Sequence, residues 1–225
     1  MHSALLMYFD RVRKGRRMPA EDVVHYFLDE FRKAKIEDAL QRHLYERDGT
    51  QQLLTFLESP EAVPHGRVAM LEHTFQCEIA GTGITGRIDR VDETADGYVI
   101  VDYKTGNPKS QELADKSLQL SIYALAMSKR GLVKALIFQN MADNTAIVSQ
   151  RSPESLQKAE AKIETAAAGI AEGRFEPTPG THCNWCGYRS ICPVKELKPR
   201  LQTENAADRN PQLSFWAEPI LARKN

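Results

Sequence analysis

Long apolar runs, a basic leader segment and abundant cysteine are all missing from this sequence of 225 residues. No apolar stretch approaches the roughly 18–20 residues that cross a membrane, so we predict no membrane-spanning helix. The first residues lack the basic segment and cleavage site of a secretion signal, and we expect a cytoplasmic protein. Lys plus Arg number 30, and Asp plus Glu also number 30. This balance excludes a polybasic chain that holds nucleic acid by bulk charge, although it is compatible with a local basic groove.

The motifs of nucleotide-driven motors and of nucleophilic hydrolases are missing as well. No Walker A sequence occurs, so we do not expect the chain to be an NTP-driven motor by itself. Residues 81–86 (GTGITG) match the dinucleotide-binding pattern in form only. That pattern needs a helix to follow it, whereas a strand is expected here, so we interpret these residues as a hairpin turn.

Hydrophobic periodicity predicts helices, three strands, a helix, two strands and a final helix, in that order. The first sixty residues have a helical pattern, and an Asp96-Gly97 pair predicts a hairpin between the second and third strands. The expected helix with Leu113, Leu118 and Tyr123 facing inward precedes the last two strands. The expected strands cover residues 68–79, 84–91, 98–104, 133–139 and 146–150, and the later helices cover residues 111–129 and 152–173. The fold class is therefore α/β, with a Cys-rich segment at residues 183–193 and a flexible tail at 199–225.

An acidic pair and a lysine stand on two neighbouring strands of this expected fold. Pairing around the Asp96-Gly97 turn brings Asp89 and Asp102 close together. Two close carboxylates repel each other unless a cation lies between them, and oxygen ligands suit Mg²⁺ or Mn²⁺. Lys104 is two residues beyond Asp102 and so points to the same face of its strand. The alternative is that these are solvated charges at a strand end.

Three sequence blocks resemble the RecB-like nuclease domain of the PD-(D/E)XK superfamily. They are residues 86–92 (GRIDRVD), 101–106 (VDYKTG) and 119–124 (QLSIYA), and the resemblance extends from His2 to about Pro193. It implies a restriction-endonuclease-like core, a central mixed sheet flanked by helices, with the catalytic part at residues 67–150 of a domain over 1–198. The helical region over residues 1–60 would precede this core.

The resemblance also assigns roles to single residues. Asp89 and Asp102 would be metal-binding carboxylates, and the main-chain carbonyl of Tyr103 would be a further ligand. Lys104 would be the catalytic lysine. Gln119 and Tyr123, four residues apart on one helical face, would line the site, with an ordinary core-facing pair as the alternative.

The resemblance assigns one more metal ligand, a histidine on an early helix, and His2 occupies that place. Family members normally carry a substantial segment before this histidine, and a ligand on a terminal residue tends to fray. Either the sequence is a fragment of a longer protein, or His2 binds metal poorly.

Three of the four cysteines, Cys183, Cys186 and Cys192, fall within ten residues. This spacing predicts a metal or cluster site in a reducing compartment rather than a disulfide framework. Several RecB-like nucleases, including the AddB subunit and CRISPR-associated relatives, hold a 4Fe-4S cluster with this spacing and a fourth cysteine far upstream. Zinc with His182 or water is the alternative. Cys77 is interpreted as a small buried residue on a central strand.

The resulting hypothesis is a Mg²⁺- or Mn²⁺-dependent deoxyribonuclease, an exonuclease forming the C-terminal part of a DNA-repair helicase–nuclease. A free-standing RecB-like exonuclease is a close alternative. The rival from another class is a non-catalytic DNA-binding or scaffolding module. The expected partners are DNA and a helicase motor, with no membrane contact. The segment from Gln212 to Trp216 (QLSFW) resembles a peptide that binds bacterial sliding clamps, and a tail that packs on its own domain is the alternative.

Overall fold

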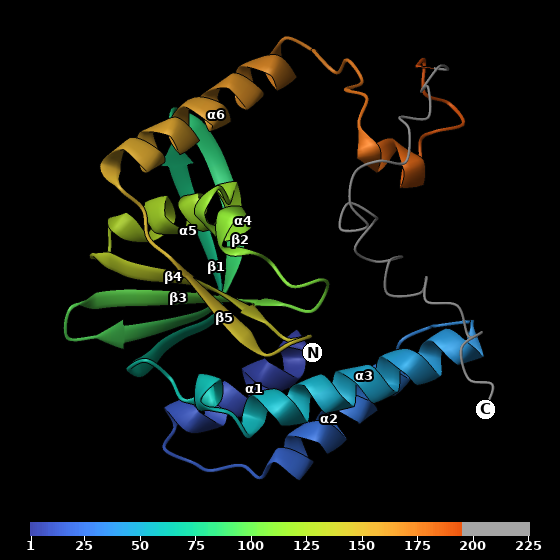
Figure 1. Ribbon diagram of the computed structural model, residues 1–225. Helices are drawn as coiled ribbons and strands as arrows, with labels where there is room; N and C mark the ends of the chain where they lie inside the picture. Colours follow the sequence, from blue (N-terminus) through green and yellow to red (C-terminus); the bar gives the residue numbers. More distant parts are fainter. Residues whose placement is uncertain (195–225) are drawn as a thin grey trace. The chain divides into compact units, whose positions relative to one another are not determined.

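The computed structural model describes residues 1–194 (Figure 1). Its contacts divide the chain into one unit over Met1–Thr165 and a second unit that begins at Ala166. The expected tail and the segment from Gln212 to Trp216 lie outside the described residues. Within the described part, no helix is long and apolar enough to cross a membrane.

Three helices form the N-terminal region: α1 (His2–Arg13), α2 (Ala20–Arg32) and α3 (Ala39–Leu57). Leu5 and Phe9 bury one face of α1, four residues apart as helical periodicity requires. The side chain of Asp38 caps α3 by accepting a hydrogen bond from the Gln41 N–H at 2.8 Å. A short 3₁₀ turn at Pro60–Ala62 then leads into the sheet.

The first unit is built on a five-stranded mixed sheet, as the sequence predicted, with strand order β1-β2-β3-β4-β5. Neighbouring strands are antiparallel except for β3 and β4, which run parallel. Two helices, α4 (Gln111–Asp115) and α5 (Leu118–Ser128), connect this parallel pair. The strands are β1 (Arg67–Ile79), β2 (Thr82–Thr94), β3 (Gly97–Lys104), β4 (Val133–Asn140) and β5 (Thr145–Ser149).

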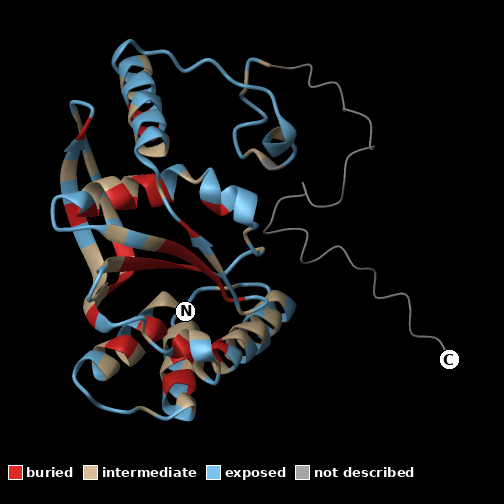
Figure 2. Ribbon diagram, turned by 60° about the vertical axis from the view of Figure 1, so that its left-hand side comes forward, coloured by how far each residue is buried: buried red, intermediate tan, exposed pale blue. Residues whose placement is uncertain are grey.

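Separate hydrophobic clusters cover the two faces of the sheet (Figure 2). Helices α1 to α3 pack on one face, where Val101 and Tyr103 of β3 join Phe9 and Phe56. Helices α4 and α5 pack on the other face, where Ile100 of β3 is buried. Because side chains alternate along β3, Asp102 and Lys104 share the face of Ile100, whereas Tyr103 points toward α1.

Two expectations for this unit are wrong. The helix over residues 111–129 is broken, because the Ser117 side chain accepts from the Leu120 N–H and starts α5 as a separate helix. As a result Leu113 and Leu118 are exposed rather than inward, at 56% and 38%. Cys77 lies on β1, an edge strand rather than a central one, and is half-buried.

The last long helix, α6 (Pro153–Ala171), begins as predicted, with Ser152 accepting a hydrogen bond from the Ser155 N–H. The second unit holds the end of this helix and a 3₁₀ turn at Thr181–Trp185. All three cysteines of the Cys-rich segment lie in or after this turn.

Candidate active site

The candidate site forms where β2 separates from β3. Pairing of these strands runs from Thr94 and Gly97 to Arg90 and Val101 and then stops. The main-chain groups of Tyr103, two residues further along β3, therefore need other partners. The Tyr103 N–H donates to Asp89 Oδ2 at 2.9 Å, and the Tyr103 carbonyl oxygen lies 3.2 Å from Nε2 of His2. The strand separation thus gathers groups from α1, β2 and β3.

Three potential metal donors meet at this point. His2 Nε2 lies 3.3 Å from Asp89 Oδ2 and 3.2 Å from the Tyr103 carbonyl oxygen. The hydrogen bond to Asp89 raises the pKa of His2, against the opposing effect of burial. The side chain of Asp89 is 12% exposed and that of His2 is 41% exposed, so the cluster opens to solvent on the His2 side.

A second group of contacts runs from Asp102 through Lys104 to α5. The Lys104 ammonium lies 2.6 Å from Asp102 Oδ2 and donates to Gln119 Oε1 at 2.7 Å. The Gln119 amide donates to the Tyr123 hydroxyl at 3.0 Å. That hydroxyl lies 3.2 Å from Asp102 Oδ1 and 2.9 Å from the carbonyl oxygen of Arg87. The four predicted residues thus form one closed network.

Burial and charge act together on this network. Burial raises the pKa of Asp102, Lys104 opposes this increase, and the negative charge of Asp89 adds to it. Burial also raises the pKa of Tyr123, and the nearby Asp102 and Asp89 add to this increase. Burial and the charge of Asp89 thus favour the neutral form of Asp102, and the Lys104 ammonium favours the ionised form.

The donors fit a divalent cation. Ligands at right angles around an ion with bonds of about 2.1 Å lie roughly 3 Å apart. His2 Nε2 lies at a similar distance from Asp89 Oδ2, 3.3 Å, and from the Tyr103 carbonyl oxygen, 3.2 Å. Asp102 Oδ2 is buried and, within residues 1–194, accepts no well-directed hydrogen bond. In the same range no three His, Cys, Asp or Glu side chains form a group that could hold a metal ion. The converging set contains two such side chains and one main-chain carbonyl.

The sequence did not single out Glu72, which faces the same cluster from β1. Glu72 lies between Leu71 and His73, and Asp89 lies between their partners Arg90 and Ile88. Burial raises the pKa of Glu72, and the charge of Asp89 adds to it. No motif marks Glu72, and only the β1–β2 register reveals its position.

The three cysteines are not gathered into a metal site. Cys183 Sγ accepts a hydrogen bond from the Gly180 N–H at 3.4 Å, and all three cysteines are free and half-buried. Among the described residues, which include Cys183, Cys186 and Cys192, no metal-holding group of three side chains occurs. The iron–sulfur cluster and the zinc alternative with His182 both stay predictions.

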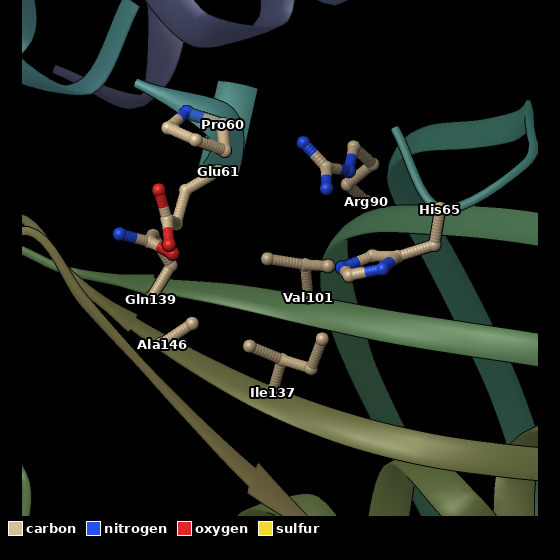
Figure 3. Close-up of a pocket in the computed structure, with 8 residues that line it drawn as sticks. All are labelled: Pro60, Glu61, His65, Arg90, Val101, Ile137, Gln139 and Ala146. Atoms are coloured by element: carbon tan, nitrogen blue, oxygen red, sulfur yellow. The ribbon is translucent and has the colours of Figure 1, made fainter. Parts of the chain in front are cut away.

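A cavity of about 240 Å³ lies elsewhere, between the sheet and the 3₁₀ turn at Pro60–Ala62 (Figure 3). Val101 and Ile137 point into it from β3 and β4, on the face opposite to Asp102. None of the predicted site residues lines it. The remaining lining residues are Pro60, Glu61, His65, Arg90, Gln139 and Ala146.

Three comparisons with known proteins bear on the family of this chain. A search of curated proteins gives no match. Among solved structures, SSO0001 matches with 18% identity and a TM-score of 0.39, covering 80% of this chain and 98% of the other. A candidate exonuclease from Eubacterium rectale matches with 11% identity and a TM-score of 0.47, covering 95% of this chain and 79% of the other. The family model of the PD-(D/E)XK nuclease superfamily matches residues 1–193, most of the chain. With that match and the mixed sheet on which the predicted Asp and Lys residues meet, the chain belongs to the PD-(D/E)XK nuclease superfamily.

Proposed function

We propose that this protein is a divalent-metal-dependent deoxyribonuclease that hydrolyses phosphodiester bonds from DNA ends. The observation that carries the proposal is the meeting of His2, Asp89 and the Tyr103 carbonyl beside the Asp102–Lys104 pair. His2, Asp89, Asp102 and the Tyr103 carbonyl would hold Mg²⁺ or Mn²⁺. A bound divalent ion would act as a Lewis acid on the scissile phosphate and would lower the pKa of the attacking water.

The chain's own residues contribute position and charge. Lys104 is fixed from both sides by Asp102 and Gln119, and its ammonium lies 4.6 Å from the centre of the Phe138 ring. Such a preorganised cation stabilises negative charge that develops on the phosphate, without reorganising during the reaction. The ammonium also favours the ionised form of Asp102, whose pKa burial alone would raise further. Tyr123 ties Asp102 to β2 through the Arg87 carbonyl.

A cleavage assay with matched variants tests the proposal. Linear DNA labelled at one end is incubated with the protein and Mg²⁺ or Mn²⁺, and single-turnover rates are measured. Lys104→Met should lower the rate by roughly 10²–10³-fold, the usual cost of removing one charge-stabilising group. Asp102→Asn should lower it at least as much, while circular dichroism shows the fold retained. Lys134→Met is the control, because Lys134 is a half-exposed β4 lysine whose ion-pair partner is Asp96 in the β2–β3 turn.

The outcomes separate the rival functions. Full activity of Lys104→Met would refute the mechanism. DNA binding without cleavage in either metal would favour a non-catalytic DNA-binding or scaffolding module. An exonuclease should leave covalently closed single-stranded circles intact, whereas an endonuclease should open them.

The finer parts of the proposal concern partners. Membership in a nuclease superfamily supports DNA as the substrate class. The resemblance to RecB-like domains supports association with a helicase motor, in the same longer chain or in a partner subunit, and work in DNA repair. The spacing of Cys183, Cys186 and Cys192 supports a 4Fe-4S cluster held by these three thiolates and a further ligand. Iron and sulfide analysis of the protein purified without air, beside its Cys183→Ser variant, tests this part.

A further inference from the structure

An exposed arginine is fixed beside the candidate site by a half-buried carboxylate. Arg87 Nε lies 2.8 Å from Glu72 Oε2, and the two side chains are 64% and 16% exposed, respectively. Arg87 pairs with Thr74 across the β1–β2 ladder, so Glu72 is its diagonal neighbour. The carboxylate thus fixes one edge of the guanidinium and leaves its other donors toward solvent.

The backbone of Glu72 is unusual for a residue inside a strand. Its φ is +44°, in the left-handed region that non-glycine residues rarely adopt. Ion pairs near the surface add little to the free energy of folding. The stability gained from the Glu72–Arg87 pair therefore does not explain why Glu72 adopts this conformation. Strained backbone of this kind is found most often at functional sites, where the surrounding structure holds it.

Two connections join this pair to the active-site network. The carbonyl oxygen of Arg87 accepts from the Tyr123 hydroxyl, which also contacts Asp102. Asp89 follows Arg87 by two residues on β2, and the charges of Asp89 and His2 both act on Glu72. Because its carboxylate is already paired with Arg87, Glu72 is better suited to orient that arginine than to bind a cation.

We propose that Arg87 binds a backbone phosphate of the DNA strand next to the scissile bond, and that Glu72 positions its guanidinium. This inference rests on the proposed function and adds a substrate-binding residue to it. A guanidinium presents five N–H donors in a rigid plane, so an Nε fixed by a carboxylate leaves both Nη groups for phosphate oxygens. Arg90 on the same strand has no such role, since it is 1% exposed and donates to the Tyr103 hydroxyl.

Equilibrium binding to single-stranded DNA at several salt concentrations tests the proposal. The measurement uses Lys104→Met as the parent, so that the DNA is not cut. Arg87→Gln should weaken binding about tenfold for every sequence and lower the salt slope by about 0.7, the value for one phosphate contact. Arg67→Gln is the matched control, because Arg67 forms an exposed ion pair with Glu93 on the same two strands. It should leave both affinity and slope unchanged.

The role of Glu72 needs a measurement that separates the orientation of the Arg87 guanidinium from its charge. On the Lys104→Met parent, Glu72→Gln should keep the salt slope of DNA binding, because Arg87 retains its charge. In the cleavage-competent protein, Glu72→Gln should nevertheless lower kcat/KM about three- to tenfold, since the guanidinium is no longer held in place. Glu72→Asp should recover part of this loss. An equal loss of slope in Glu72→Gln and Arg87→Gln would contradict a positioning role.

The proposal is overturned if Arg87→Gln binds with the affinity and salt slope of its parent while the wild type still cleaves DNA. It is also overturned if Arg67→Gln changes both quantities as much as Arg87→Gln does, because bulk charge would then explain the effect. A wild-type protein that binds DNA but does not cleave it would instead refute the proposed function and leave the binding result valid. A protein that does not bind DNA at all would overturn both.

Discussion

Arg90 should be one of the most costly residues to replace in this protein. Its side chain is 1% exposed, and its Nε lies 3.2 Å from Oδ1 of Asp92, which is fully buried. Its Nη1 donates to the Tyr103 hydroxyl at 2.7 Å, and its guanidinium lies 4.2 Å from the centre of the Phe9 ring. Arg90→Met would remove all three interactions and leave the carboxylate of Asp92 buried without its cation.

The expected cost follows from these contacts. Removing one partner of a buried ion pair lowers the free energy of unfolding by about 3–5 kcal/mol. This is a large share of the roughly 5–15 kcal/mol by which whole domains are stable. It corresponds to a decrease in Tm of roughly 6–20 °C for a chain of this size.

A double variant separates the ion pair from the packing. Arg90→Met with Asp92→Asn removes both charges, and the amide oxygen can still accept from the His65 N–H, as Asp92 Oδ2 does at 3.0 Å. What remains is the Tyr103 hydroxyl without its donor, at a cost of about 1–3 kcal/mol. The double variant should therefore be more stable than Arg90→Met alone.

The pH dependence has a definite sign. Burial raises the pKa of Asp92 above the ordinary value of 3.8, and Arg90 opposes this increase. Without Arg90 the pKa of Asp92 in the folded state rises further. At a pH between 3.8 and that raised pKa, folding therefore takes up a proton. The stability that Asp92 contributes is then greatest below pH 3.8 and is lost as the pH rises. The deficit of Arg90→Met relative to wild type should shrink as the pH is lowered.

Urea unfolding followed by circular dichroism measures these differences. Fluorescence is less suitable, because both tryptophans, Trp185 and Trp216, lie outside Met1–Thr165. A cost below about 1 kcal/mol for Arg90→Met would refute the reasoning, since it falls within the range of ordinary surface substitutions. If the double variant loses as much free energy of unfolding as the two single variants together, the two charges are not coupled.

Two further predictions concern the site itself. Tyr123→Phe removes the hydroxyl that contacts Asp102 and the Arg87 carbonyl. Single-turnover cleavage should slow about tenfold, as expected for the loss of one buried hydrogen bond. An unchanged rate would show that the Tyr123 hydroxyl has no part in the mechanism. The bond to Asp89 raises the pKa of His2 above 6.5, so a proton competes with metal there. Mn²⁺ affinity, measured by calorimetry, should fall by up to about tenfold per pH unit below that pKa, because the imidazole must be neutral to bind a metal. His2→Ala should bind Mn²⁺ more weakly and lose this His2-dependent change, and identical pH profiles for the two proteins would contradict the assignment.

The sequence predicted the succession of helices and strands and the β2–β3 hairpin because short-range rules determine both. The Asp96-Gly97 turn sets the β2–β3 register, and strand alternation places Lys104 beside Asp102, where the structure has them 2.6 Å apart. The helix over residues 111–129 was wrong for a related reason. Apolar periodicity continues through Ser117, but its side chain competes for the backbone and starts a new helix.

Glu72 was not singled out, because no motif marks it and its place emerges only when the β1–β2 ladder is paired residue by residue. That ladder keeps one register from Ile79 and Thr82 to Met70 and Val91, which sets Glu72 opposite Asp89. The cysteines show another limit, since their close spacing along the chain predicts a shared site, whereas among the described residues the three thiols form no metal-holding group.

The separation of β2 from β3 gives Asp89 a structural task that Asp102 does not have. In a strand, the N–H and carbonyl of one residue point to the same side, and those of Tyr103 meet Asp89 and His2 rather than a strand. The next residue, Lys104, directs its carbonyl to the other side, where the Met141 N–H donates to it at 2.8 Å. Asp89 therefore satisfies the backbone that a continuous ladder would have paired, and the same geometry directs the Tyr103 carbonyl toward the metal donors. The geometry of the candidate site thus arises from an interrupted sheet, which is why a side chain, His2, can reach a main-chain oxygen of the central strand.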